Sequence, residues 1–256
     1  MIQDLYALLE EKYRQYNCPG FIADDPISIP HQFRNRVDIE IAGFWVATLA
    51  WGQRRTILRS AQQLMGLMGH EPHRFVLAAS EAEQAQLDHF VHRTFNGIDA
   101  RYFLRALRHL YTTAGGLEGV FRAGVQPGAT TLAGGIRHFY QQFFALPGVP
   151  PRTRKHVPNI DKGAAAKRLN MYLRWMIRKD KQGVDFGLWD LPPRLLLCPL
   201  DVHTGRVARH LGLLQRRQDD WRAVCELTEA LRQLDPEDPV KYDFALFGLG
   251  AAEGMR

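Results

Sequence analysis

The stretch CPLDVHTGRVARHLGL, residues 198–213, contains the most informative pattern in the chain. A short apolar segment leads to Asp201, after which Val202, Arg206 and Arg209 fall on successive turns of a helix. An aspartate in this place accepts hydrogen bonds from the first free N–H groups of a helix. We therefore predict a helix over residues 201–211 with Asp201 as its N-cap. Because most caps have no catalytic role, this stretch alone fits a structural carboxylate as well as a functional one.

Helical periodicity also dominates the rest of the chain. Alternating apolar and polar runs, which are typical of half-buried strands, are nearly absent. We expect an all-α protein in which Asp99 and Asp219 are further N-caps and Gly115-Gly116 ends a helix. The predicted helices span residues 3–13, 38–51, 54–68, 81–92, 99–114, 131–144, 163–180, 201–211, 219–233 and 239–252.

The composition is that of a globular protein with a local excess of positive charge. The chain has 256 residues, 46% of them hydrophobic and 23% charged, which is enough for one large or two small cores. The formal net charge of +6 favours an anionic partner such as nucleic acid. Residues 150–183 contain ten Lys or Arg and two Asp, so this segment accounts for the whole excess.

An irregular basic connection is predicted near residues 146–161. Pro147, Pro150, Pro151 and Pro158 interrupt any helix there. We interpret this connection as a boundary between two lobes.

Cysteine usage and hydropathy indicate a reduced, cytoplasmic protein. Cys18, Cys198 and Cys225 lie far apart, which argues against an iron–sulfur cluster. Residues 1–15 are predicted to form an amphipathic helix with acidic side chains, so we expect no secretion signal. No apolar stretch approaches the roughly 20 residues that span a bilayer, and we expect no membrane contact.

The helix predicted over 163–180 has two different faces. Leu169, Leu173, Met176 and Ile177 recur at helical spacing and are predicted to face the core. Lys167 lies on the opposite side, and Met171, Arg174 and Arg178 all project within roughly 40° of it. The pattern therefore predicts an outward cationic face, which suits either a solvated surface or a functional site.

Three segments in order resemble the helix-hairpin-helix DNA glycosylase superfamily. Leu-Asp-Val-His at 200–203, followed by Gly-Arg-Val-Ala and Leu-Gly-Leu, resembles the segment of endonuclease III-type and 8-oxoguanine glycosylases in which the catalytic aspartate caps a helix. LAWGQRRT at 49–56 is similar to a loop whose glutamine lies near the flipped base, and DPVKYDFALFGLG at 238–250 resembles a late helix. KRLN at 167–170, with Trp175-Met176, also resembles a bacterial branch related to this superfamily.

The resemblance implies a two-lobed helical bundle with a cleft between the lobes, formed by the whole chain as a single glycosylase-like unit. Lys167 and Asp201 are 34 positions apart, which is similar to the archaeal 8-oxoguanine glycosylase branch. By the resemblance, Lys167 is the nucleophile and Asp201 is the catalytic carboxylate. The residues implied at the base pocket are Trp51, Gln53, Met171, Asp243 and Phe247.

The expected function is excision of a damaged base, such as 8-oxoguanine, from double-stranded DNA. Lys167 would attack the sugar C1′ of an extruded nucleotide while Asp201 stabilises the positive charge, and β-elimination would then cleave the strand. This chemistry needs no metal and no other cofactor, and it would associate the protein with the nucleoid. The residues expected to contact DNA are Arg54, Arg154, Lys155, Arg174, Arg178, Lys179, His203 and Arg206.

One departure from the superfamily pattern concerns the phosphate-binding hairpin. Leu-Pro-Gly-Val at 146–149 has the expected first letters, but Pro150 and Pro151 follow and would block the second helix. We expect residues 159–166 to bind phosphate instead, with Gly163 opening a helix N-terminus. Two other functions fit the same pattern: a non-catalytic DNA- or RNA-binding protein that retains the fold, and an enzyme acting on a nucleoside or on RNA.

Overall fold

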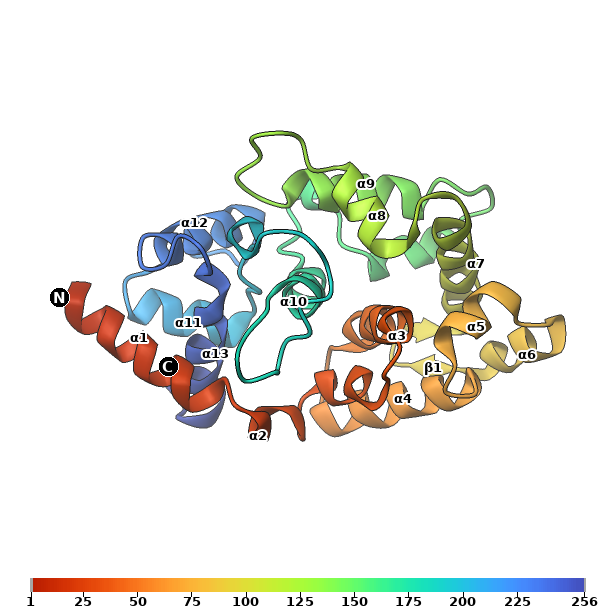
Figure 1. Ribbon diagram of the computed structural model, residues 1–256, viewed down its shortest axis with the longest axis horizontal. Coiled ribbons are helices and arrows are strands. Elements are labelled where there is room, and N and C mark those ends of the chain that lie inside the picture. The colour runs from red at the N-terminus through yellow and green to blue at the C-terminus, as the bar shows by residue number, and fades with distance from the viewer. Residues whose placement is uncertain (1, 256) are drawn as a thin grey trace. The chain divides into compact units, whose positions relative to one another are not determined.

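The computed structural model describes residues 2–255 and is mostly helical, with one small two-stranded sheet (Figure 1). The expectation of an all-α protein is thus confirmed. The chain divides into two units. Unit 1 contains the chain up to Ala23, Gly128–Leu132 and the chain from Asn159 onward, whereas unit 2 contains Asp24–Pro127 and Ala133–Pro158. One crossing between the units falls between Pro158 and Asn159, within the irregular connection.

Unit 1 is built from helices at both ends of the chain. Its α-helices are α1 (Ile2–Tyr16), α2 (Pro19–Ile22), α10 (Lys167–Ile177), α11 (Val202–His210), α12 (Trp221–Arg232) and α13 (Asp243–Phe247). Short helices of other types are η5 (Ile160–Lys162), η6 (Pro193–Leu195), η7 (Pro239–Tyr242) and the π-helix η8 (Gly248–Ala252). Helix α1 packs on α13 and η8, so distant parts of the sequence share one core.

Helix α10 of unit 1 is buried from Leu169 to Ile177. The apolar face predicted for it is confirmed. The outward face predicted for Arg174 and Arg178 is wrong, because their side chains are only 4% and 1% exposed. The helix begins at Lys167, later than predicted, because the preceding Ala166 has a left-handed backbone with φ of 53°.

Unit 2 is a second helical assembly with its own core. Its α-helices are α3 (Arg36–Leu49), α4 (Arg54–Leu67), α5 (Pro72–Ala78), α6 (Glu81–Ala85), α7 (Gly97–Thr113), α8 (Gly116–Ala123) and α9 (Ala133–Phe143). The 3-10 helices are η1 (Pro26–Ser28), η2 (Pro30–Gln32), η3 (Gln86–His89) and η4 (Pro151–His156). Strands β1 (Val91–His92) and β2 (Phe95–Asn96) pair antiparallel, with Val91 opposite Asn96.

Aromatic rings fill the core of unit 2. Phe44 of α3, Phe103 of α7 and Phe143 of α9 meet with ring centroids 4.8–5.9 Å apart. Helices α8 and α9 approach so closely that a Cβ atom at Gly134 would lie 2.3 Å from the Gly124 carbonyl oxygen. No larger residue fits at Gly134 without moving the two helices apart.

Several local predictions for the helices need correction. The helix predicted over 81–92 ends in η3 and the hairpin, where Arg93 adopts a positive φ of 54°. Helices α5 and α8 were not predicted. Asn96 rather than Asp99 caps α7, because the Asp99 carboxylate accepts a hydrogen bond from the Asn96 N–H, and Asp220 rather than Asp219 caps α12.

Within residues 2–255, none of the helices combines the length and the apolar character that crossing a bilayer requires.

Candidate active site

Lys167 and Asp201 each lie at the N-terminus of a helix in unit 1. Lys167 is the first residue of α10. Asp201 is the N-cap of α11, as predicted, and its Oδ1 accepts hydrogen bonds from the backbone N–H groups of His203 at 2.9 Å and Thr204 at 3.0 Å. These two bonds fix the orientation of the carboxylate.

The amine of Lys167 and the carboxylate of Asp201 lie close together. The distance from Lys167 Nζ to Asp201 Oδ2 is 3.8 Å, and each side chain is 31% exposed. Lys167 Nζ also lies 3.7 Å from Met171 Sδ, one turn along α10. Because Oδ1 of Asp201 serves the helix cap, Oδ2 is the atom that faces the amine. A molecule arriving from solvent can therefore meet an amine and a carboxylate oxygen together.

A second carboxyl group, that of Asp243, belongs to the same electrostatic environment. Asp243 is the first residue of α13 and is only 7% exposed. Burial raises its pKa to about 6, against the opposing effect of the Arg174 and Lys167 charges, and the Asp201 charge raises it further. The site thus contains one buried carboxyl group that titrates near neutral pH.

The other reactive group nearby is the thiol of Cys198, which is fully buried. Burial raises the pKa of this thiol well above its ordinary value, and the charge of Asp243 acts in the same direction. A thiol of this kind stays protonated and contributes to packing rather than to nucleophilic chemistry.

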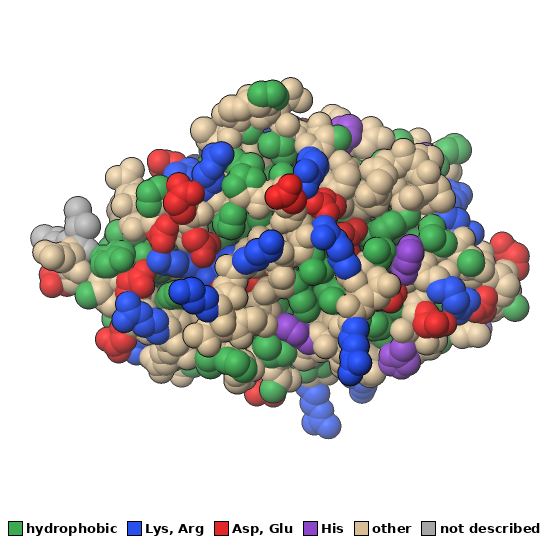
Figure 2. Space-filling model, in the orientation of Figure 1, with side chains coloured by type: hydrophobic (Ala, Val, Ile, Leu, Met, Phe, Trp, Pro, Cys, Tyr) green, Lys and Arg blue, Asp and Glu red, His purple; other side chains and the backbone are tan. Residues whose placement is uncertain are grey.

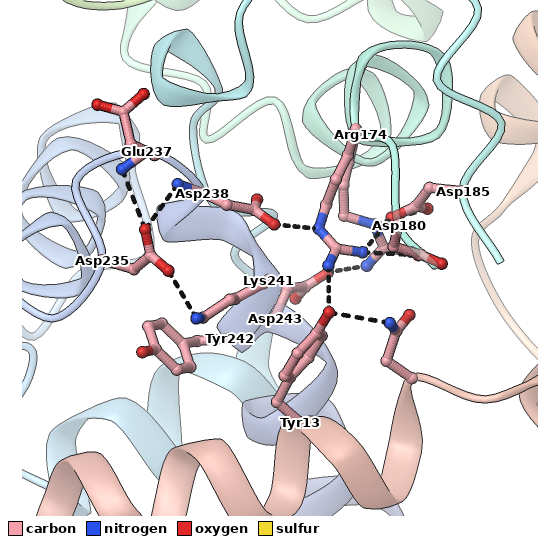
Figure 3. Close-up of polar contacts among 12 residues, drawn as sticks. Tyr13, Arg174, Asp180, Asp185, Asp235, Glu237, Asp238, Lys241, Tyr242 and Asp243 are labelled. Atoms are coloured by element: carbon pink, nitrogen blue, oxygen red, sulfur yellow. Dashed lines mark hydrogen bonds and ion pairs between the residues drawn. The ribbon is translucent and has the colours of Figure 1, made fainter. Parts of the chain in front are cut away.

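Arg174 and Arg178 of the α10 region are held by carboxylates inside unit 1. Figure 3 shows Arg174 beside Asp185 and Asp243. Arg174 bonds to Asp185 through Nε at 3.2 Å and to Asp243 through Nη1. Arg178 bonds to Asp185 at 3.0 Å and to Asp238 at 2.8 Å. Burial raises the pKa of Asp185 even though both guanidinium groups lower it. These two arginines are therefore part of a buried ionic network.

The predicted DNA contacts of Arg174 and Arg178 are consequently wrong. A guanidinium that is nearly inaccessible and already bonded to carboxylates cannot reach a phosphate. The six other predicted contact residues are exposed, three in unit 1 (Lys179, His203 and Arg206) and three in unit 2 (Arg54, Arg154 and Lys155). On the face drawn in Figure 2, basic side chains are interspersed with acidic ones rather than gathered in one field.

The residues expected at the base pocket are divided between the units. Met171 and Asp243 are buried in unit 1, and Phe247 lies one turn after Asp243 on α13, where its ring meets that of Phe21 edge-on at 5.9 Å. Trp51 and Gln53 belong to unit 2.

The two unit 2 residues have different surroundings. Gln53 is exposed and precedes α4 without a side-chain capping bond. Trp51 is half-buried, with its ring centroid 4.8 Å from that of His92 and 5.9 Å from that of His156. Within unit 1, the structure thus brings together Lys167, Asp201 and Asp243.

The phosphate-binding role predicted for residues 159–166 lacks the expected helix. Gly163 ends η5 with a positive φ of 82°, and α10 starts four residues later. The Gly163 carbonyl oxygen accepts a hydrogen bond from the Trp221 N–H at 3.0 Å. The prediction that Gly163 opens a helix is therefore wrong.

Sequence reasoning missed the carboxylates of Asp185 and Asp238, which neutralise the arginines. The only signal available was their acidic character in segments following a basic helix.

Among residues 2–255, no group of three or more His, Cys, Asp or Glu side chains is placed to hold a metal ion.

The fold and site define a helical protein of two units with a lysine–aspartate pair at two helix N-termini. A family model described as "Protein of unknown function (DUF2400)" matches residues 25–252, and the chain belongs to this family. Neither a search of curated proteins nor a search of solved structures gave a match.

Proposed function

We propose that the protein is a DNA N-glycosylase with abasic-site lyase activity that uses the Lys167 amine as its nucleophile. The observation that carries this proposal is the 3.8 Å approach of Lys167 Nζ to Asp201 Oδ2, with both side chains partly open to solvent. The resemblance of residues 200–213 to the glycosylase segment supports the same assignment. The proposal includes the two-lobed glycosylase type of fold, with the two units as its lobes, and a single glycosylase-like chain.

In the proposed reaction, a damaged nucleotide is extruded from double-stranded DNA. The neutral amine of Lys167 forms a bond to C1′ as the bond from C1′ to the base breaks, and the departing base takes up a proton. The nitrogen lone pair then forms a second bond to C1′ as the bond from C1′ to the ring oxygen O4′ breaks, and O4′ takes up a proton, so the sugar ring opens and a protonated imine results. Removal of a proton from C2′ then expels the 3′ phosphate, which cleaves the strand, and water releases Lys167 from the sugar.

Asp201 would act on the sugar through a single oxygen. Its Oδ1 is committed to two backbone N–H groups, so the negative charge at Oδ2 is held beside the amine and close to the positive charge that develops at C1′. A fixed carboxylate stabilises that charge without reorganising. Exposed Lys179, His203 and Arg206 are the unit 1 side chains that would contact phosphates.

Borohydride trapping tests the nucleophile. The whole chain is incubated with duplexes containing an abasic site or 8-oxoguanine, and borohydride reduces any imine to a stable adduct. We expect an adduct with the wild type and with the control Lys181→Ala, whose exposed lysine lies in the same unit but outside the pair and outside the proposed phosphate contacts. We expect none with Lys167→Ala.

A second variant separates catalysis from folding. Asp201→Asn keeps an oxygen that can cap α11 but removes the charge, so thermal stability should change little while adduct formation slows by about a hundredfold. Absence of an adduct with every lesion duplex would contradict the proposal.

A second candidate is a non-catalytic DNA- or RNA-binding protein. The ion pair of Lys167 with Asp201 also suits a purely electrostatic role for the lysine. This function predicts salt-dependent binding of duplexes without any covalent adduct. An enzyme acting on nucleosides or on RNA predicts release of a base without steep salt dependence of duplex binding.

A further inference from the structure

Unit 2 contains a pocket that is independent of the lysine–aspartate pair. Its volume is about 660 Å³, within the usual range for small-molecule sites. Helix α7 forms one wall with Arg101, Arg105 and Arg108, and the segment α6–η3 contributes acidic and amide side chains. None of the residues predicted for DNA or base binding lines this pocket.

The three arginines lie on one face of α7, because they are spaced by four and three residues. Main-chain carbonyl groups hold two of them. Arg105 Nη2 donates to the Pro147 oxygen at 2.6 Å, and its guanidinium lies 5.3 Å from the centre of the Tyr102 ring. Arg108 Nε donates to the Val76 oxygen at 2.7 Å.

These contacts orient Arg105 and Arg108 without neutralising them. A peptide carbonyl carries no net charge, and a guanidinium has five N–H donors, so both groups keep donors for another acceptor. Within the part of the chain that the structure describes, no carboxylate forms an ion pair with either one. The acidic residues of the pocket lie beside Arg101 instead. The distance from Arg101 Nη2 to Glu81 Oε2 is 3.5 Å, and that from Arg101 Nε to Asp88 Oδ1 is 3.4 Å.

Other residues of the pocket lining add an apolar surface beside Arg105 and Arg108. Ile98, in the first turn of α7, is 55% exposed, and Pro150 contributes a rigid apolar ring. A ligand that fits this lining has an anionic group for the two guanidinium groups and a larger body for the apolar side. Phosphate oxygens match the planar fork of arginine, which can bond to two of them at once.

We propose that this pocket binds a small organic phosphate, such as a nucleoside diphosphate, with Arg105 and Arg108 holding the phosphate oxygens. The same phosphate chemistry exists in the backbone of DNA. The concave lining, with an apolar side beside the two arginines, favours a free ligand, because a backbone contact needs only surface cations. The proposal does not depend on catalysis by Lys167.

Isothermal titration calorimetry on the whole chain tests the proposal, with ADP and inorganic pyrophosphate as probes. We expect both to bind. Arg105→Gln and Arg108→Gln should each weaken ADP binding about tenfold, since each removes a charge-assisted hydrogen bond. Arg59→Gln is the control, because Arg59 is an exposed arginine of α4 outside the lining, and it should bind ADP like the wild type.

Three results with these small probes would overturn the assignment. One is absence of heat with both probes for the wild type. Another is unchanged ADP binding in Arg105→Gln. This variant changes an exposed side chain, and its thermal stability is measured in parallel to show that it is folded. The third is citrate binding as tightly as pyrophosphate, which would make the pocket a general anion site.

Undamaged duplex DNA distinguishes the source of the phosphate. If the duplex displaces ADP and the double variant Arg105→Gln/Arg108→Gln weakens both to the same degree, the arginines serve the DNA backbone and the small-ligand proposal is wrong. Lys167→Ala should bind ADP normally and fail in borohydride trapping, so failures of the two proposals give different results.

Discussion

The arginines at the end of α10 and two of the arginines of α7 have opposite roles. Arg174 and Arg178 at the end of α10 lie inside unit 1 and bond to Asp185, Asp238 and Asp243. Arg105 and Arg108 of α7 bond to main-chain carbonyl groups beside a pocket of unit 2. Carboxylate partners cancel the charge and make the arginine part of the fold, whereas carbonyl partners leave the charge available. The acceptor, more than the helical spacing, decides the role of the arginine.

The largest expected effect comes from breaking the buried network of α10. Arg178→Met leaves the buried Asp185 and the partly exposed Asp238 without one of their partners, which should lower the free energy of unfolding by about 3–5 kcal/mol. Urea denaturation measures this change. Arg206→Met is the control, because it removes an exposed arginine of the same unit and should change stability by less than about 0.5 kcal/mol. Equal effects of the two substitutions would contradict the distinction between the helices.

An intermediate effect should appear in the pH dependence of stability. The pKa of Asp243 is raised by burial to about 6 in the folded protein, above its value near 3.9 in an unfolded chain. The folded state then binds the proton more tightly, so stability is fully present below about pH 4 and is lost as the pH rises through 6.

Asp243→Asn removes this titration. Between pH 4 and pH 7 the wild type should lose roughly 2 kcal/mol relative to the variant, which denaturation at a series of pH values would show. Parallel stability curves for the two proteins would mean that Asp243 does not titrate in this range.

The smallest effect is expected for the arginines of α7. Arg105→Gln removes an exposed side chain whose bond is to a carbonyl group, and the unfolding free energy should fall by no more than about 1 kcal/mol. Thermal unfolding is the measurement. A loss as large as that of Arg178→Met would show that Arg105 also serves the fold.

The sequence could predict what depends on neighbouring residues. The apolar positions of α10, from Leu169 to Ile177, follow helical periodicity, and the capping role of Asp201 depends on the next three residues. The burial of Arg174 could not be predicted in this way, because its partner Asp243 is 69 positions away. Helical angles give the direction of a side chain but not what lies in that direction.

The functional regions of the molecule likewise contain residues that the sequence predicts and residues that it does not. The motif around Asp201 and the lysine at the start of α10 are visible in the sequence. The fold places Lys167 Nζ 3.8 Å from Asp201 Oδ2. The pocket of α7 was missed, because it depends on a turn at Pro147 and on helices that are short or irregular. Helix α5, whose carbonyl groups hold Arg108, was itself absent from the prediction.

The path of the chain between the two units has a consequence for protein synthesis. All of unit 2 has been translated once Pro158 has left the ribosome, so its core can close early. Helix α1 is made long before α13 and η8, on which it packs, and before Glu253, whose carboxylate accepts a hydrogen bond from the Tyr16 hydroxyl at 2.8 Å. During most of translation the apolar face of α1 has no partner. We therefore expect chaperones to bind this helix in nascent chains that stall before residue 243.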